Sequence, residues 1–193
     1  MSLRPREQGP RGLRVLGIDP GSGVTGFGVV LREGGSLRHV AHGNLRLRSA
    51  GALPARLREL HQAVAELIAR YQPAVVAVED VFVAANARSA LVLGQARGAV
   101  LAAVGATGLP LAEFAPARIK LAVAGNGRAA KRQVQFMVGR LLGLGSAPPA
   151  DAADALAVAI CCAQTGGLAA VGVFARRRRR PPSPKRLDPR HLR

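Results

Sequence analysis

The hydrophobic and polar positions near the start of the chain predict a β-hairpin. Two apolar runs, residues 15–18 and 27–31, flank a short segment of glycine, proline and serine, which is typical of antiparallel strands joined by a tight turn. The first run ends in Asp19. A carboxylate at the end of a buried strand is costly to desolvate unless it meets a cation, and the neighbouring glycines let a bulky group approach the backbone. Asp19 therefore fits a metal site that acts on a phosphate, a cradle for a nucleotide phosphate, or an acid that only satisfies the turn amides.

The rest of the pattern predicts alternating strands and helices. Residues 74–78 form a continuous apolar run, as expected for a strand buried on both faces. The segment that opens at Pro54 has apolar residues at helical spacing until Pro73 ends it. This order indicates an α/β fold. We expect further strands at 37–47 and 109–114, and further helices at about 85–104, from Pro116, at 133–142 and from about Ala150.

Charge divides the chain into a folded body and two tails. The formal net charge is +17, and nine of the 28 Lys and Arg residues lie at 176–193 with one of the 11 acids. The preceding residues keep 19 basic and 10 acidic side chains, so the body is also positive. A polyanion is therefore the expected partner. We predict a disordered N-terminal arm at 1–13, a folded domain at 14–166 and a disordered basic tail at 167–193.

Four acids stand at the ends of apolar elements. Glu79 and Asp80 follow the continuous apolar run, and only one of them can point toward Asp19 because strand side chains alternate between faces. We choose Glu79, which directly follows the run. Asp151 and Asp154 are three residues apart and so share one face of the last predicted helix. The helix dipole accounts for Asp151, whereas Asp154 precedes an almost wholly apolar segment and needs a partner.

Such a set of carboxylates predicts a metal centre. Carboxylates that cluster without cations repel one another and have raised pKa values, and oxygen-rich sites select hard divalent ions such as Mg²⁺ or Mn²⁺. Two ions of this kind can activate water and stabilise the leaving oxygen in phosphodiester cleavage. No Ser/His/Asp or Cys/His set is apparent. The adjacent Cys161 and Cys162 are expected to be reduced and buried in a helix.

Several other side chains fit a nucleic-acid surface. Phe82 follows the second acid-bearing strand in a predicted loop, where it could stack on a base or serve as a helix staple. A glycine loop at 125–127 leads into basic residues at a helix start, which the helix dipole disfavours unless a phosphate binds there. A solvated basic turn is the alternative. The candidate DNA-binding residues are Phe82, Arg88, Lys120, Arg128, Lys131 and Arg132.

Five segments resemble the bacterial RuvC Holliday junction resolvases in order and spacing. They are LGIDPGSGVTGFGVV, VAVEDVF, NARSALVLGQARGAV, KRQVQFMV and ADAADALAVAICC, and the similarity covers residues 14–164. The resemblance implies an RNase H-like fold, with a mixed five-stranded sheet flanked by helices, working as a homodimer. It also implies Mg²⁺-dependent, symmetric nicking of four-way DNA junctions that leaves 5′-phosphate and 3′-hydroxyl ends. RuvA and RuvB are the implied protein partners.

The same resemblance implies roles for individual residues. The metal-binding and catalytic acids would be Asp19, Glu79, Asp151 and Asp154, around two Mg²⁺ ions with Mn²⁺ as an alternative. Phe82 matches an aromatic residue thought to contact junction bases, Lys120 and Lys131 match basic residues near the cleaved backbone, and the helix after Asn86 resembles the family's dimer helix. Asp80 departs from the family pattern and could weaken the approach of DNA or alter the metal preference. At the position of Asp151 some family members use a different residue.

Other functions stay open from the sequence. A related RNase H-like enzyme, similar to the YqgF-type proteins, would prefer structured RNA to junction DNA. An actin-like or sugar-kinase ATPase would share the turn after Asp19, although the chain is too short for two such lobes. A non-catalytic junction-binding protein would use the acids for a structural metal. Because no uninterrupted apolar run reaches the roughly 18 residues of a membrane-spanning helix and no signal peptide is evident, we expect a cytoplasmic protein without a membrane partner.

Overall fold

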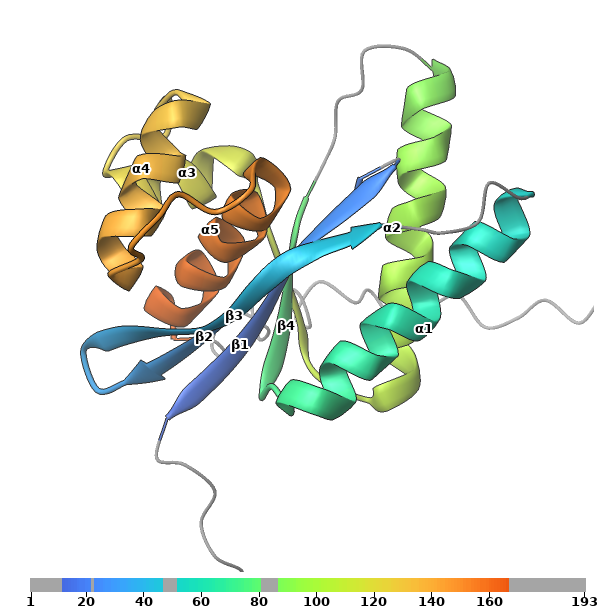
Figure 1. Ribbon diagram of the computed structural model, residues 1–193, viewed down its shortest axis with the longest axis horizontal. Helices are drawn as coiled ribbons and strands as arrows, with labels where there is room; N and C mark the ends of the chain where they lie inside the picture. The colour runs from blue at the N-terminus through green and yellow to red at the C-terminus, as the bar shows by residue number, and fades with distance from the viewer. Residues whose placement is uncertain (1–11, 22, 47–51, 81–86, 167–193) are drawn as a thin grey trace, which may run out of the picture.

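The predicted hairpin and the strands after it form one mixed sheet. The computed structural model describes residues 12–21, 23–46, 52–80 and 87–166 (Figure 1), so most of both predicted tails lies outside it and stays a prediction. The strands are β1 (Leu13–Asp19), β2 (Val24–Glu33), β3 (Ser36–Arg46), β4 (Val75–Glu79) and β5 (Leu111–Phe114). Their order is β3-β2-β1-β4-β5. Strand β2 pairs antiparallel with β1 and β3, whereas β4 runs parallel to β1 and β5, which confirms the mixed five-stranded sheet.

The described helices cover both faces of this sheet. They are α1 (Leu53–Tyr71), α2 (Ala87–Thr107), α3 (Pro116–Ala124), α4 (Lys131–Leu142) and α5 (Ala150–Gln164). Helices α1 and α2 lie on one face, and α3, α4 and α5 lie on the other (Figure 1). Each predicted helix is present, with ends shifted by a few residues. The shift that matters is at α4, which begins at Lys131 rather than Gln133 and so holds two basic residues in its first turn.

Side-chain alternation divides the strands between two hydrophobic cores. On β1, Val15 packs in the core beneath α5, whereas Ile18 packs in the core beneath α1 and α2. Strand β4 follows the same odd and even division. Because this alternation continues to the strand ends, Asp19 and Glu79 fall on the α5 face and Asp80 on the α2 face. The two cores therefore decide which acids can meet.

Helix α5 lies close against the sheet because β1 and β2 carry glycines where it crosses them. A Cβ atom at Gly17 would lie 2.1 Å from the Ala155 carbonyl oxygen, and one at Gly26 would lie 2.0 Å from the Asp151 carbonyl oxygen. The sequence predicts that these glycines admit a bulky group close to the backbone. That group is a helix of the protein itself, and it is the helix that carries Asp151 and Asp154.

Replacing Gly26 by Ala will push the first turn of α5 away from β2. The new methyl group would meet backbone atoms, which cannot rotate aside, so we expect the free energy of unfolding to fall by about 1–3 kcal/mol or more. Gly139→Ala on α4 is the matched control, because a Cβ atom there meets nothing within 4 Å. In a helix this change should stabilise by up to about 1 kcal/mol. Equal denaturation curves for Gly26→Ala and the parent protein would contradict the close packing.

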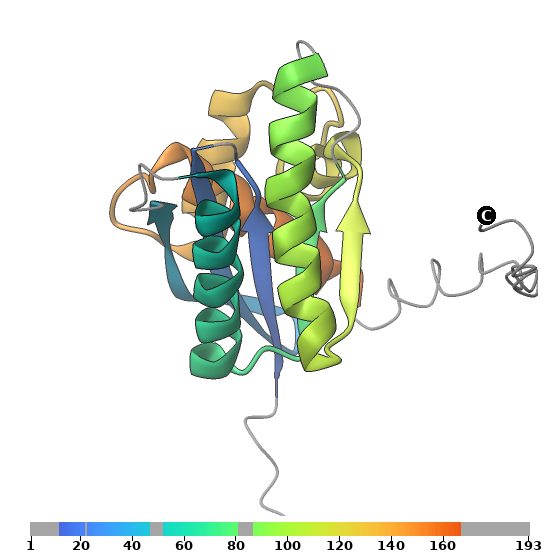
Figure 2. The same cartoon turned by 90° about the vertical axis from the view of Figure 1, so that its right-hand side faces the viewer.

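Helix α2 has one covered and one uncovered face. Ala96 and Val100 are buried in the core beneath the helix. On the outer side Leu91 is 63% exposed, and a Cβ atom at Gly94 or Gly98 would meet no atom within 4 Å. Figure 2 shows no described helix or strand in front of this outer face. The exposed Gly94 and Gly98 therefore do not serve contact between α2 and the sheet.

The same helix bears on the expectation that no uninterrupted apolar run is long enough to span a membrane. By length and composition alone, the stretch Ser89–Thr107 is long and apolar enough to cross a membrane, with 22% of it buried. A few polar residues interrupt its apolar run without making the segment polar as a whole. One of them, Arg97, forms ion pairs with Asp80, directly after β4, and with Glu113 on β5. These contacts hold the helix against the sheet of the folded domain.

The two cysteines behave as the sequence predicts. Cys161 and Cys162 are free and buried in α5. Burial raises the pKa of Cys161 to about 11 and that of Cys162 to about 12. Because the thiolate is the reactive form, both are core residues without a part in the chemistry.

Candidate active site

Two parallel strands bring Asp19 and Glu79 to the same end of the sheet, where both strands finish. Ile18 on β1 pairs with Val78 on β4, so the acids that directly follow them stand on neighbouring strand ends. The four residues before each acid are buried, and alternation places both carboxyls on the α5 face. Glu79, as predicted, is the acid of its strand that faces Asp19: its charge acts on the Asp19 carboxyl.

Helix α5 brings the other two predicted acids over these strand ends. Asp151 lies in the first turn, where its charge suits the helix dipole, and Asp154 follows one turn later. Sequence reasoning missed their neighbour Asn44 on β3. Its Nδ2 donates to Asp151 Oδ2 at 3.5 Å, and its Oδ1 is buried without a hydrogen-bond partner. No local pattern could have revealed Asn44, because a polar residue on an alternating strand is ordinary.

Burial and neighbouring carboxyls raise the pKa values of Asp19 and Glu79. The pKa of Asp19 rises from its ordinary 3.8 to about 7, mainly through burial and then through the charges of Asp154, Glu79 and Asp151, against an opposing effect of Lys131. The pKa of Glu79 is also raised, again by burial first and then by Asp154. A buried carboxyl that is half protonated at neutral pH indicates a site short of positive charge.

Lys131 forms an ion pair with one of these acids, Asp154. Its Nζ lies 2.6 Å from Asp154 Oδ2, and this hydrogen bond is the main cause that raises the pKa of Lys131. From the sequence, a bound phosphate or a solvated turn would explain a lysine at this helix start. In the structure the Asp154 carboxylate offsets the unfavourable helix dipole. The Lys131 side chain is 61% exposed, so it is free to exchange this partner for another.

A cavity of about 260 Å³ opens beside the acids. Glu79, Asp154, Lys120 and Lys131 line its polar part, and apolar side chains of α3, α4 and α5 line the rest. Carboxylates and ammonium groups therefore face the same space. Such a space can hold a cation and a phosphate side by side.

The donor set suits a divalent cation, although its side chains are not gathered around one. Among the described residues, no group of three His, Cys, Asp or Glu side chains is arranged to hold a metal ion. Carboxylates without a cation repel one another, and Lys131 holds Asp154. The unpartnered Asn44 Oδ1 and the raised pKa of Asp19 still describe an oxygen-rich site that lacks positive charge. Mg²⁺ and Mn²⁺ prefer such ligands, so the predicted metal-binding residues fit but stay a prediction.

Residues 15–162 match the family model described as crossover junction endodeoxyribonuclease RuvC. The chain belongs to the RuvC family. Relatives that carry this name include one from Aromatoleum aromaticum, 53% identical over 86% of this chain and 89% of the relative. Another, from Geobacter sp. strain M21, is 50% identical over 81% of this chain and 96% of the relative.

Solved RuvC structures share the fold of this chain. The structure of Thermus thermophilus RuvC has 36% sequence identity and a TM-score of 0.74, and the match covers 82% of this chain and 98% of that one. The same protein in complex with a Holliday junction substrate gives a TM-score of 0.76 at 36% identity, over 82% and 97% of the two chains. The RNase H-like fold implied by the sequence resemblance is therefore confirmed.

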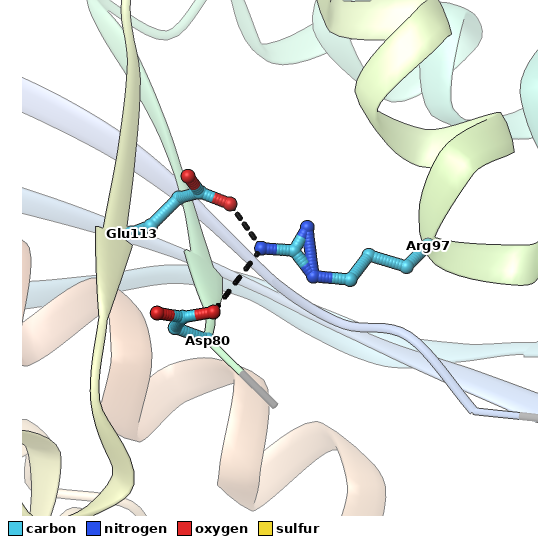
Figure 3. Close-up of polar contacts among 3 residues, drawn as sticks. All are labelled: Asp80, Arg97 and Glu113. Carbon is cyan, nitrogen blue, oxygen red and sulfur yellow. Dashed lines mark hydrogen bonds and ion pairs between the residues drawn. The ribbon is translucent and has the colours of Figure 1, made fainter. Parts of the chain in front are cut away.

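The extra acid in this RuvC-family chain does not face the site. Asp80 Oδ1 lies 3.7 Å from Arg97 Nη2 on α2, and the same nitrogen contacts Glu113 on β5 (Figure 3). Asp80 is not among the charges that raise the pKa of Asp19 or Glu79. The observed contact of Asp80 therefore gives no support to the expectation that it weakens the approach of DNA or alters the metal preference.

The predicted DNA-binding residues of this RuvC-family chain fall into two groups. Lys120 and Lys131 border the cavity, and Arg128 and Arg132 are exposed around the start of α4. These four form a basic border on one side of the acids. Two other candidates lie outside the described structure: Phe82 and the side chain of Arg88.

Proposed function

We propose that this protein is a structure-selective endonuclease that resolves four-way (Holliday) DNA junctions by symmetric phosphodiester cleavage, in recombination and DNA repair. The observation that carries the proposal is that carboxyls of β4 and α5 line one cavity with two lysines, and that their charges act on the Asp19 carboxyl of β1. Carboxylates bind cations and lysines bind phosphates, so the site offers both parts that phosphodiester cleavage needs. Membership of the RuvC family and the likeness to Thermus thermophilus RuvC in complex with a Holliday junction support the four-way junction as the substrate.

We further propose that two Mg²⁺ ions, or Mn²⁺ in their place, complete the site. Asp19, Glu79, Asp151 and Asp154 would hold them. When bound, the ions supply an activated water and a stabilised leaving oxygen, which gives 5′-phosphate and 3′-hydroxyl ends. The protein's own part is to present Asp19 without its proton and to release Asp154 from Lys131. The freed Lys131 ammonium then becomes available to a phosphate oxygen of the strand.

The surface formed by α3 and α4 is the proposed contact with the DNA backbone. Residues 114–150 contain six Lys and Arg residues and neither Asp nor Glu. In the described structure, Asp154 is the one acid that pairs with any of them. Unpaired basic side chains on one surface attract phosphates and hold the duplex without reading its sequence. The cut phosphate would then lie between Lys120, Arg128, Lys131 and Arg132 on one side and the acids on the other.

We propose a homodimer joined through the outer face of α2. A stripe of small side chains (Gly94, Gly98 and Ala102) and the neighbouring Leu91 are exposed there. Small residues let a second helix approach closely, and apolar ones favour burial. Two copies would supply the two sites that symmetric cleavage requires. Partnership with RuvA and RuvB is proposed from the family resemblance alone, and the cytoplasmic location stays an expectation from the sequence.

Synthetic four-way junctions with each strand labelled in turn test the function. With Mg²⁺ or Mn²⁺ we expect two nicks at symmetric positions, which DNA ligase can reseal because the ends are 5′-phosphate and 3′-hydroxyl. A chelator should prevent the nicks, and a linear duplex of the same sequence should stay intact. Binding without cleavage would identify a junction-binding protein instead of a nuclease. Preferred cleavage of structured RNA would identify the related RNA-processing activity.

A further inference from the structure

Arg97 joins three elements on the α2 face of the sheet. It lies in the middle of α2, and its side chain is only 16% exposed. Its Nη2 atom contacts Glu113 on β5 and lies 3.7 Å from Asp80, directly after β4 (Figure 3). The two carboxylates come from neighbouring strands, and like charges that close repel each other. The guanidinium between them therefore holds the ends of β4 and β5 together and fixes α2 above them.

This contact is one residue away from the predicted metal-binding Glu79. The Asp80 N–H donates to the Phe114 carbonyl oxygen at 2.8 Å, which continues the pairing of β4 with β5 beyond Glu79. Glu79 and Asp80 are joined by a planar peptide bond, so a displacement of the Asp80 backbone is passed on to Glu79. Alternation sends Glu79 to the acid cluster and Asp80 to Arg97. A force that holds Asp80 on one face of the sheet thus sets the place of Glu79 on the other.

We propose that Arg97 is a positioning residue for Glu79. By holding Asp80 and Glu113 it fixes the end of β4, and with it the Glu79 carboxyl that would bind a divalent cation. The inference rests on the proposed function in giving Glu79 that role. Arginine suits the task because its planar guanidinium presents several N–H donors in a fixed geometry, whereas a lysine ammonium is a single flexible point charge. Since α2 is also the proposed dimer helix, Arg97 connects the subunit interface to one of the acids.

Arg97→Met tests the proposal, because methionine keeps much of the side chain's bulk and removes the charge. Outer contacts that orient metal ligands are worth about 10- to 100-fold in metal affinity or activity. We expect Mn²⁺ binding without DNA, measured by calorimetry, to weaken by about that factor. Junction affinity in a chelator should stay within about twofold, and single-turnover cleavage should fall and partly recover at high Mn²⁺ concentration. Arg97→Lys should restore only part of the Mn²⁺ affinity.

Arg38→Met is the matched control, because it removes an arginine from an exposed pair with Glu33 at the far end of β2 and β3. It should leave Mn²⁺ affinity and cleavage unchanged. If Arg97→Met does not fold, Asp80→Asn replaces it as the test, because it keeps the contact of Arg97 with Glu113. We expect it to weaken Mn²⁺ binding about tenfold. Wild-type Mn²⁺ affinity in the folded variants would overturn the proposal. A parent protein that binds Mn²⁺ but cuts no junction would instead refute the proposed function, while the Mn²⁺ measurements would still test Arg97.

Discussion

Asp19→Asn and Glu79→Gln will each abolish junction cleavage while leaving junction binding nearly unchanged. Each change keeps the shape of the side chain and removes a negative charge from the acid cluster. Loss of one metal-binding carboxylate should cost about 4 kcal/mol of transition-state stabilisation, a rate loss of about 10³-fold. Binding depends on the basic surface around Lys120 and Lys131, and both changes leave its cationic side chains in place. Single-turnover cleavage with Mg²⁺, and fluorescence anisotropy of a labelled junction in a chelator, measure the two properties separately.

The control for these variants is Glu33→Gln. It makes the same chemical change at an exposed acid whose partner is Arg38, at the hairpin between β2 and β3. An exposed ion pair contributes about 0–1 kcal/mol to stability, so cleavage and binding should both stay at the parent level. Loss of binding together with cleavage in Asp19→Asn or Glu79→Gln would mean that the acids organise the DNA surface itself. Cleavage at a large fraction of the parent rate would remove these residues from the metal site.

The acids could be located from the sequence because each marks a visible change in pattern. Asp19 and Glu79 end apolar runs, and side-chain alternation separates Glu79 from Asp80 without knowledge of the fold. The structure agrees, since Glu79 faces the cluster and Asp80 pairs with Arg97. The order of strands and helices follows from periodicity in the same way. Such local rules are enough to predict the position of a residue when its surroundings are determined by the strand or helix to which it belongs.

Contacts between distant elements could not be predicted in this way. Asn44 approaches Asp151 across 107 positions of sequence, and Lys131 meets Asp154 only because α4 packs beside α5. The sequence shows that the basic start of α4 needs a negative partner, but not whether that partner is a phosphate or a carboxylate. The need for a negative partner can be read from the local sequence, but the residue that supplies it lies far away in the chain. The close packing of α5 on Gly26 is another such case, because a glycine indicates that space is needed at that position but not which group fills it.

Asp19→Asn will also stabilise the metal-free protein, and the gain will grow with pH. The folded-state pKa of Asp19 is about 7 and its ordinary value is 3.8, so between these values the folded state binds more protons than the unfolded chain. The stability that the protonated Asp19 side chain contributes is therefore fully present below about pH 4 and is lost as the pH rises through about 7. The full penalty is on the order of 4 kcal/mol. Asparagine carries no charge, so the variant avoids this loss.

Urea denaturation in a chelator at pH 5 and pH 8 checks this sign and size. We expect the advantage of Asp19→Asn over the parent protein to be about 3 kcal/mol larger at pH 8 than at pH 5. Mg²⁺ should reduce the difference at pH 8, because a ligand that binds the folded parent protein stabilises it and the variant has lost one of the ligands. Glu33→Gln, which removes an exposed acid outside the site, is measured beside it as the control for a lost charge. An advantage that is equal at both pH values would mean that burial and neighbouring charges do not oppose ionisation of Asp19, and that the site does not require a cation to balance its charge.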